Sequence, residues 1–278
     1  MMQFKYSLSK KGKIICDGCG KKTAVAYLEN ETGNFVTGAM KCDRSENCGY
    51  HKKPENNNAT IQVKEEPIKV TNYLPMSLVV KHYEMGNCHL VNFLLTKFSE
   101  SELIKAHHFY LLSSINKETI FWQIDQLEQI RSGKVMNYNP LTGKRVKDNE
   151  GKASIRWMHK QPYNLKQCLF GLFRVNENKE KIIAIVESEK TAVIMSIYVP
   201  HFIWLATGSK SGFKLEYLSP IKNRKIIGFP DKGCFKEWSD KALEMNNFGY
   251  NITISSLIEN TNCEDGLDIA DLYLNQTK

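Results

Sequence analysis

The sequence contains no apolar run long enough to cross a membrane. A transmembrane helix needs about 20 consecutive apolar residues, and no stretch of this 278-residue chain approaches that length. The first residues, MMQFKYSLSKKGKIIC, also lack the apolar core of a secretory signal peptide. No internal repeat is visible. We therefore expect a cytoplasmic protein without a membrane partner.

The charge balance of the chain is basic. Lys and Arg together number 38 and Asp and Glu number 30, which gives a net charge of +8. Such a balance favours nucleic acid as a partner, because Lys and Arg release counterions from a phosphate backbone. A basic soluble protein without that partner would have the same composition. The hydrophobic content of 42% is enough for a sizeable core.

Half of the eight cysteines lie near the N-terminus. They form two close pairs with a hairpin-length insert between them: Cys16 with Cys19, and Cys42 with Cys48. Clustered cysteines in a reducing compartment indicate metal, and two such pairs supply four thiolates to a tetrahedral structural Zn²⁺. His51 is an alternative to Cys48 as the fourth ligand. We expect a zinc-ribbon-like module over residues 1–52 and a polar linker over 53–69.

The segment after the linker changes from helical to strand-like patterns. Apolar residues in 70–112 recur every three to four positions, and Ser99 followed by Glu102 predicts a capping box at the start of a helix. Strands are expected at 120–124 and 134–138, with polar turns between them.

A basic, aromatic stretch occupies residues 131–160. Cations interleaved with aromatic rings suit single-stranded nucleic acid, with phosphates on Lys and Arg and bases stacked on rings. A twisted sheet with a solvated basic face would give the same pattern. The candidate nucleic-acid-binding residues are Arg131, Lys134, Lys144, Arg145, Arg156, Trp157 and Lys160.

From residue 181 onward, strand patterns alternate with helix patterns. Strands are expected at 181–186, 202–206, 225–229 and 252–254, and helices at 191–197, 215–218 and 235–248. The strand segments are apolar throughout, which is typical of parallel strands buried on both faces. The expected fold class is therefore α/β, with an open sheet of parallel strands at the C-terminal end of the chain.

Acidic residues follow the ends of these expected strands. Glu187 ends the first strand, Asp231 follows the third, and Asp268 and Asp271 lie beyond the fourth. The carboxyl ends of parallel strands meet at one edge of a sheet, where carboxylates can hold Mg²⁺ against phosphate oxygens. Any one of these acids alone could instead be a helix N-cap or a solvated loop residue.

These motifs resemble a known family. Residues 181–275 resemble a TOPRIM domain, the catalytic fold shared by topoisomerases, bacterial-type primases and some nucleases. The resemblance rests on Val186-Glu-Ser-Glu-Lys190, Ala206-Thr-Gly-Ser209, Pro230-Asp-Lys-Gly233 and Gly266-Leu-Asp-Ile-Ala-Asp271. Upstream, the segments that resemble the basic subdomain of bacterial primases are Ile120-Phe-Trp-Gln-Ile-Asp125, Arg131-Ser-Gly-Lys-Val-Met136 and Cys168-Leu-Phe-Gly-Leu172. The implied order is zinc ribbon, basic α+β subdomain (70–178) and TOPRIM-like domain (179–278).

The resemblance implies a primase-like nucleotidyltransferase of the kind carried by mobile elements or phages. Such an enzyme binds single-stranded DNA and nucleoside triphosphates, makes primers by metal-dependent phosphoryl transfer, and works with a replicative helicase, here encoded separately. Besides the structural Zn²⁺, it implies catalytic Mg²⁺ or Mn²⁺. The implied ligands are Glu187 and Asp231, which are also the catalytic residues, together with Asp268 and Asp271.

The chain departs from the family pattern at the acidic motifs. Ser188 replaces the usual Gly, and one acid of the Asp-x-Asp motif is missing, with either Gly233 or Phe229 in its place. Glu189 or Asp268 could compensate for that loss. Two alternatives to the primase therefore remain: a catalytically reduced TOPRIM protein that binds single strands or a replication partner, and a TOPRIM nuclease.

Overall fold

The computed structural model describes residues 5–54, 60–61, 70–85, 88–262 and 264–276. The chain divides into two compact units, residues 1–69 and 70–278. Most of the expected linker over 53–69 lies outside the described residues. Within the described part, no helix is both long enough and apolar enough to cross a bilayer.

The N-terminal unit is an antiparallel sheet in the order β1-β2-β3-β4, with β5 paired to β3. Its strands are β1 (Tyr6–Leu8), β2 (Ala24–Glu29), β3 (Phe35–Cys42), β4 (His51–Lys52) and β5 (Thr60–Ile61). The buried cluster of this unit is small and contains Cys16, Ala24, Met40 and Cys42. So few apolar residues stabilise a fold weakly, which is why such units need a metal or another cross-link.

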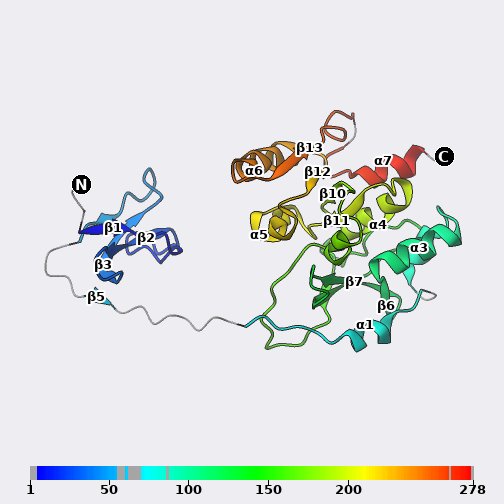
Figure 1. Cartoon of the computed structure of the whole chain (residues 1–278), viewed down its shortest axis with the longest axis horizontal. Coiled ribbons are helices and arrows are strands. Elements are labelled where there is room, and N and C mark those ends of the chain that lie inside the picture. The colour runs from blue at the N-terminus through cyan, green and yellow to red at the C-terminus, as the bar shows by residue number, and fades with distance from the viewer. Residues whose placement is uncertain (1–4, 55–59, 62–69, 86–87, 263, 277–278) are drawn as a thin grey trace. The chain divides into compact units, whose positions relative to one another are not determined.

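The second unit begins with helices α1 (Met76–His82), α2 (His89–Leu94) and α3 (Glu100–Tyr110), drawn in cyan to blue-green in Figure 1. The predicted capping box is confirmed. The backbone N–H of Glu102 donates to the Ser99 hydroxyl, and the Ser99 N–H donates to the Glu102 carboxylate at 2.9 Å.

An antiparallel sheet follows in the order β6-β7-β8-β9. Its strands are β6 (Ser113–Ile115), β7 (Glu118–Ile124), β8 (Ile130–Met136) and β9 (Ile155–Trp157). The strand expected at 134–138 is therefore β8, which begins four residues earlier and ends two residues earlier. Both faces of β7 and β8 are buried. Ile120, Trp122 and Val135 on one face pack against α1 and the 3₁₀ helix η1 (Leu172–Asn176), whereas Phe121 and Met136 on the other face pack with α2 and α3.

The C-terminal sheet has the order β11-β10-β12-β13, and each neighbouring pair is parallel. Its strands are β10 (Ile183–Val186), β11 (Ile203–Ala206), β12 (Lys225–Gly228) and β13 (Asn251–Ile254). The helices are α4 (Glu189–Tyr198), α5 (Leu215–Leu218), α6 (Phe235–Asn247) and α7 (Ile269–Gln276), with 3₁₀ helices η2 (Lys210–Gly212) and η3 (Ser219–Ile221). The expected α/β class, with its sheet of parallel strands, is confirmed.

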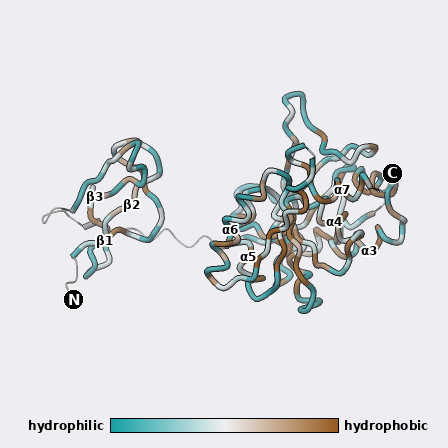
Figure 2. The backbone as a smooth tube through the Cα atoms, turned by 90° about the horizontal axis from the view of Figure 1, so that it is seen from above, coloured by the Kyte–Doolittle hydropathy of each residue, from teal (hydrophilic) through white to brown (hydrophobic). Residues whose placement is uncertain are grey.

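Both faces of this sheet are covered. Ala184 and Val186 of β10 pack with α3, α4 and α7, whereas Ile183 and Ile185 pack with α5 and α6. In Figure 2 the brown, hydrophobic stretches lie between α5 and α6 on one side and α4 on the other. This two-sided burial explains the continuous apolar runs in the sequence. It also leaves the carboxyl edge of the strands as the place where polar side chains can gather.

Candidate functional site

The zinc ligands predicted from the sequence come together in the N-terminal unit. The Sγ atoms of Cys16, Cys19, Cys42 and Cys48 all lie within 4.8 Å of one another. The Cys16 and Cys48 Sγ atoms are 3.8 Å apart. Tetrahedral Zn²⁺ with Zn–S bonds of about 2.3 Å requires S···S separations of roughly 3.8 Å, so the four thiols fit the ion. The backbone N–H of Lys21 lowers the pKa of the Cys19 thiol to about 6, which favours the thiolate.

His51 is engaged elsewhere. Its Nε2 is 2.8 Å from the Tyr27 hydroxyl, and the two rings stack. The alternative in which His51 replaces Cys48 is therefore wrong for this structure, because Cys48 completes the sulfur cluster and His51 lies on β4.

Glu187 follows the last residue of β10 at the carboxyl edge of the parallel sheet. It is 9% exposed, and its Oε1 has no hydrogen-bond partner among the described residues. Burial raises the pKa of this carboxyl, while the Cys234 thiol and the backbone N–H of Asp231 stabilise its ionised form. A buried carboxylate oxygen without a partner is costly, and a cation would satisfy it.

Asp231 lies in the loop after β12, beside Glu187. Burial raises its pKa first, and the charges of Glu187, Asp268 and Asp271 raise it further, to about 8. The positive charge of Arg145 lowers the pKa of Asp231. The structure thus brings the four acids of the sequence analysis into one electrostatic neighbourhood, in which like charges repel one another.

Asp268 and Asp271 have a second role at the start of α7. The Asp271 N–H donates to Asp268 Oδ1 at 2.9 Å, and the Asp268 N–H donates to Asp271 Oδ2 at 3.2 Å. The Thr191 hydroxyl of α4 also donates to Asp268. This reciprocal pair is a capping box, in which Asp268 has the N-cap role that the sequence left open and Asp271, in the first turn of α7, bonds back to it. Burial and the nearby charge of Asp268 raise the pKa of Asp271.

The four carboxylates do not converge as tightly as the thiols. Among the residues that the structure describes, the cysteine cluster is the one group in which three or more ligand atoms lie within 4.8 Å of one another. The acids therefore form an open arrangement. Mg²⁺ suits such an arrangement, since it usually keeps several waters and is completed by substrate phosphates.

Cations surround these acids. Lys144 and Lys190 lower the pKa of Asp271. Arg145 lowers the pKa of Asp231, and Lys210 lowers the pKa of Glu187. Sequence reasoning placed Lys144 and Arg145 in the nucleic-acid segment and missed Lys190, Lys210 and Cys234. The available signal was position, since Lys190 is the last residue of the motif Val186–Lys190 and Lys210 follows directly on the motif Ala206–Ser209.

Other candidates of the basic segment are already paired. Arg131 bonds Asp125 at 2.7 Å and lies over the Tyr73 ring. Arg156 pairs with Glu118. Lys134 is 5% exposed, and its ammonium contacts Glu189, so we assign it an internal role in place of phosphate contact.

The remaining candidates lie nearer the solvent. Lys144, Arg145 and Lys160 are exposed, and Trp157 is half-buried. Trp157 neighbours His159, whose ring stacks on Tyr163 at a centroid distance of 4.3 Å.

The two residues that could stand in place of the missing acid, Phe229 and Gly233, each have a clear structural environment. Phe229 packs on Trp204 with ring centroids 5.3 Å apart. Gly233 has a φ of +84°, a left-handed conformation that favours glycine. Glu189 is 2% exposed and bonds Lys134 at 2.9 Å, so its carboxylate is engaged by an internal cation. Asp231 is the acid that this motif retains.

Two family models match this zinc-ribbon and parallel α/β chain. Residues 4–62 match the model of a zinc beta-ribbon finger. Residues 88–232, more than half of the chain, match the family described as a domain of unknown function (DUF6371), and the chain belongs to this family. A search among curated proteins found no match.

Similar solved structures are phage and bacterial primase domains. The primase fragment of the bacteriophage T7 primase–helicase protein is 15% identical with a TM-score of 0.45, covering 97% of this chain and 96% of that one. The DnaG primase catalytic domain bound to ssDNA is 11% identical with a TM-score of 0.48, covering 72% and 73%. The RNA polymerase domain of Mycobacterium tuberculosis DnaG is 13% identical with a TM-score of 0.40, covering 70% and 67%. These values are too low to carry an argument about function, which has to rest on the side chains themselves.

Proposed function

We propose that this protein is a primase-like nucleotidyltransferase that binds single-stranded DNA and joins nucleoside triphosphates with the help of Mg²⁺ or Mn²⁺. The observation that carries the proposal is the buried Oε1 of Glu187, which finds no hydrogen-bond partner among the described residues and lies beside Asp231 at the carboxyl edge of a parallel sheet. Ligands of open α/β sheets bind at this edge. The sequence resemblance to a TOPRIM domain points to the same residues.

In this proposal Glu187 and Asp231 hold the divalent ion, and Asp268 and Asp271 add negative charge behind them. Once bound, the ion would neutralise charge on the phosphates during phosphoryl transfer. Lys144, Arg145, Lys190 and Lys210 flank the acids. Phosphoryl transfer depends chiefly on positioning and charge stabilisation, and these cations would attract the triphosphate and orient it.

The zinc ribbon and the basic segment complete the proposal. Residues 70–178 would form the basic subdomain, with the exposed cations Lys144, Arg145 and Lys160 on the path of the template. Residues 179–278 would form the TOPRIM-like domain. A separately encoded replicative helicase and an origin in a mobile element or phage are further parts of the proposal, supported by the sequence resemblance alone.

A second candidate is a binding module without catalysis. It is favoured by Phe229, which is one of the two residues that could stand in place of the missing acid of the Asp-x-Asp motif. Its apolar ring packs on Trp204 and cannot bind a metal ion. A single retained acid in that motif weakens metal binding while leaving the basic surface unchanged.

Primer synthesis distinguishes the candidates. Full-length, zinc-loaded protein is incubated with a single-stranded template, all nucleoside triphosphates, and Mg²⁺ or Mn²⁺. New oligonucleotides support the primase and shortened template indicates a nuclease. Retention of the template without either product indicates the binding module and contradicts the proposal.

A further inference from the structure

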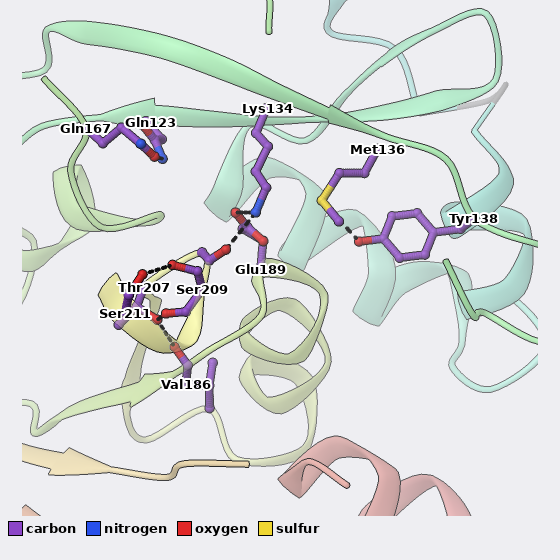
Figure 3. A network of polar contacts seen from close by, with 11 residues as sticks. Gln123, Lys134, Met136, Tyr138, Gln167, Val186, Glu189, Thr207, Ser209 and Ser211 are labelled. Carbon is purple, nitrogen blue, oxygen red and sulfur yellow. Dashed lines mark hydrogen bonds and ion pairs between the residues drawn. The ribbon is translucent and has the colours of Figure 1, made fainter. Parts of the chain in front are cut away.

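A buried lysine connects the two sheets of the second unit at the edge of the candidate site. Lys134 lies inside β8 and is 5% exposed. Its Nζ donates to Glu189 Oε1 at 2.9 Å and to the Gly208 carbonyl at 2.8 Å. Figure 3 shows the lysine side chain reaching from its strand down to Glu189, with Thr207 and Ser209 close by.

Both acceptors lie just after strand ends that carry site residues. Glu189 is the first residue of α4, two positions after Glu187, and Gly208 lies in the turn after β11, two positions before Lys210. One ammonium group therefore holds the ends of β10 and β11 in a fixed relation. Lys210 in turn pairs with Glu237 at 3.1 Å, and its positive charge lowers the pKa of Glu187.

The turn itself is built around this contact. Gly208 has a φ of +76°, and an added Cβ would lie 3.1 Å from Glu189 Oε1 and 3.6 Å from Lys134 Nζ. The Thr207 N–H donates to the Val186 carbonyl at 3.0 Å, and its hydroxyl donates to the Ser209 carbonyl at 2.7 Å. These bonds tie the turn to the end of β10, while the Gly208 carbonyl is left to Lys134.

Stability alone does not explain a buried ion pair. Taking both charges out of water costs about as much as their attraction returns, and a well-packed apolar pair in their place is often as stable or more so. What the pair adds is positional specificity. An ammonium group with two fixed acceptors holds the start of α4 and the turn after β11 at defined places.

We propose that Lys134 is a positioning residue for the candidate site. It acts through Glu189 and Gly208 to fix the turn 207–210 and the start of α4, and so sets where Lys210 and Glu187 stand relative to Asp231. Its effect on turnover rests on the proposed function, whereas its effect on the turn does not.

The test is a double variant of the full-length protein, Lys134→Met with Glu189→Met, which removes both charges together. We expect its unfolding temperature to stay near that of the wild type, while amide exchange across residues 207–210 becomes roughly tenfold faster or more. Arg131→Met with Asp125→Asn is the matched control, since it also removes both charges of a pair together. It breaks the buried Arg131–Asp125 pair of the same sheet, and it should leave exchange in the turn unchanged.

Nucleotide kinetics add a second readout. If the protein makes primers, the double variant should raise the KM for nucleotide more than it lowers kcat, because Lys210 would contact phosphate in the ground state as well as in the transition state. If the wild type makes no primers, the exchange measurement still decides the positioning role, so the two proposals fail separately.

Wild-type exchange across 207–210 in a folded double variant would overturn the inference, because the pair would then be core packing only. Should the double variant not fold, Gly208→Ala strains the turn without removing the pair. It is expected to give the same rise in exchange and in KM. Faster exchange in this variant with an unchanged KM in an active enzyme would also overturn the inference.

Discussion

The environment of Asp231 departs from what stability alone would favour. Burial and the charges of Glu187, Asp268 and Asp271 raise its pKa to about 8. A fold gains nothing by gathering like charges, and such groupings are common at functional sites. The cost should be measurable at this single carboxyl.

Asp231→Asn should stabilise the protein at alkaline pH. Because the folded pKa is raised, the folded state binds more protons than the unfolded state from about pH 4 to pH 8, so stability falls as pH rises through this window. Relative to the wild type, we expect the variant to melt about 2–4 °C higher at pH 9, the shift produced by about 1 kcal/mol.

The difference should shrink toward pH 4, where the carboxyl is neutral in the folded state and only about half ionised in the unfolded state. Thermal melts from pH 4 to pH 9 provide the measurement, and Asp240→Asn on the exposed face of α6 is the control. A variant that is no more stable than the wild type at pH 9 would mean that the acids do not repel one another as described.

The candidate site was only partly predictable from single residues. Glu187 and Asp231 could be identified because each follows a strand end, and parallel strands bring those ends to one edge. Asp268 and Asp271 lie well beyond the last strand, at the start of α7. The capping of α7 by Asp268 and Asp271 could not be separated from metal binding, since both roles use a carboxylate at the same place. The pairing of Lys134 with Glu189 joins residues that are 55 positions apart, and no local pattern reveals it.

Elements differ in how clearly the sequence specifies them. The parallel strands were predicted to within two residues, because short apolar runs bounded by turns have few alternatives. β8 was misplaced because the charged Arg131 also lies inside it, ahead of Lys134, the first residue of the expected strand. Their partners, Asp125 and Glu189, make a charged residue acceptable inside a buried strand.

The zinc ribbon should depend on its metal while the second unit does not. We expect about one Zn²⁺ per chain, bound by four thiolates. In the double variant Cys42→Ala, Cys48→Ala the ion should be lost and the zinc-ribbon-like module expected over residues 1–52 should unfold, because its buried cluster is small. The melting transition of residues 70–278 should remain.

Elemental analysis and amide exchange of the purified protein are the measurements. A Cys88→Ala, Cys168→Ala variant is the control, because both residues are buried in the second unit and their loss should not change zinc content. Full zinc retention in the Cys42, Cys48 variant would contradict the assignment of ligands.

At the scale of the whole molecule, the positive charge that is free for a partner is smaller than the composition suggests. Arg131, Lys134 and Arg156 are engaged by internal acids. Lys144, Arg145 and Lys160 are exposed. Binding of single-stranded DNA should therefore depend on this second group.

A triple variant, Lys144→Ala, Arg145→Ala and Lys160→Ala, should weaken binding of single-stranded DNA and flatten its salt dependence. Each lost phosphate contact lowers the slope of log K against log salt by about 0.7 for single strands. Fluorescence anisotropy from low to physiological salt measures this, with Lys236→Ala on α6 as the control. An unchanged slope in the triple variant would place the binding surface elsewhere.

The central claim is that Glu187 takes part in metal-dependent nucleotidyl transfer, and primer synthesis by the Glu187→Gln variant tests it most directly. The amide keeps the shape of the side chain and removes its charge. The account predicts that synthesis on a single-stranded template with Mg²⁺ or Mn²⁺ falls roughly a hundredfold or more, while the variant binds that template as tightly as the wild type. Wild-type rates of synthesis in the variant, or no synthesis by the wild type under any of these conditions, would contradict it.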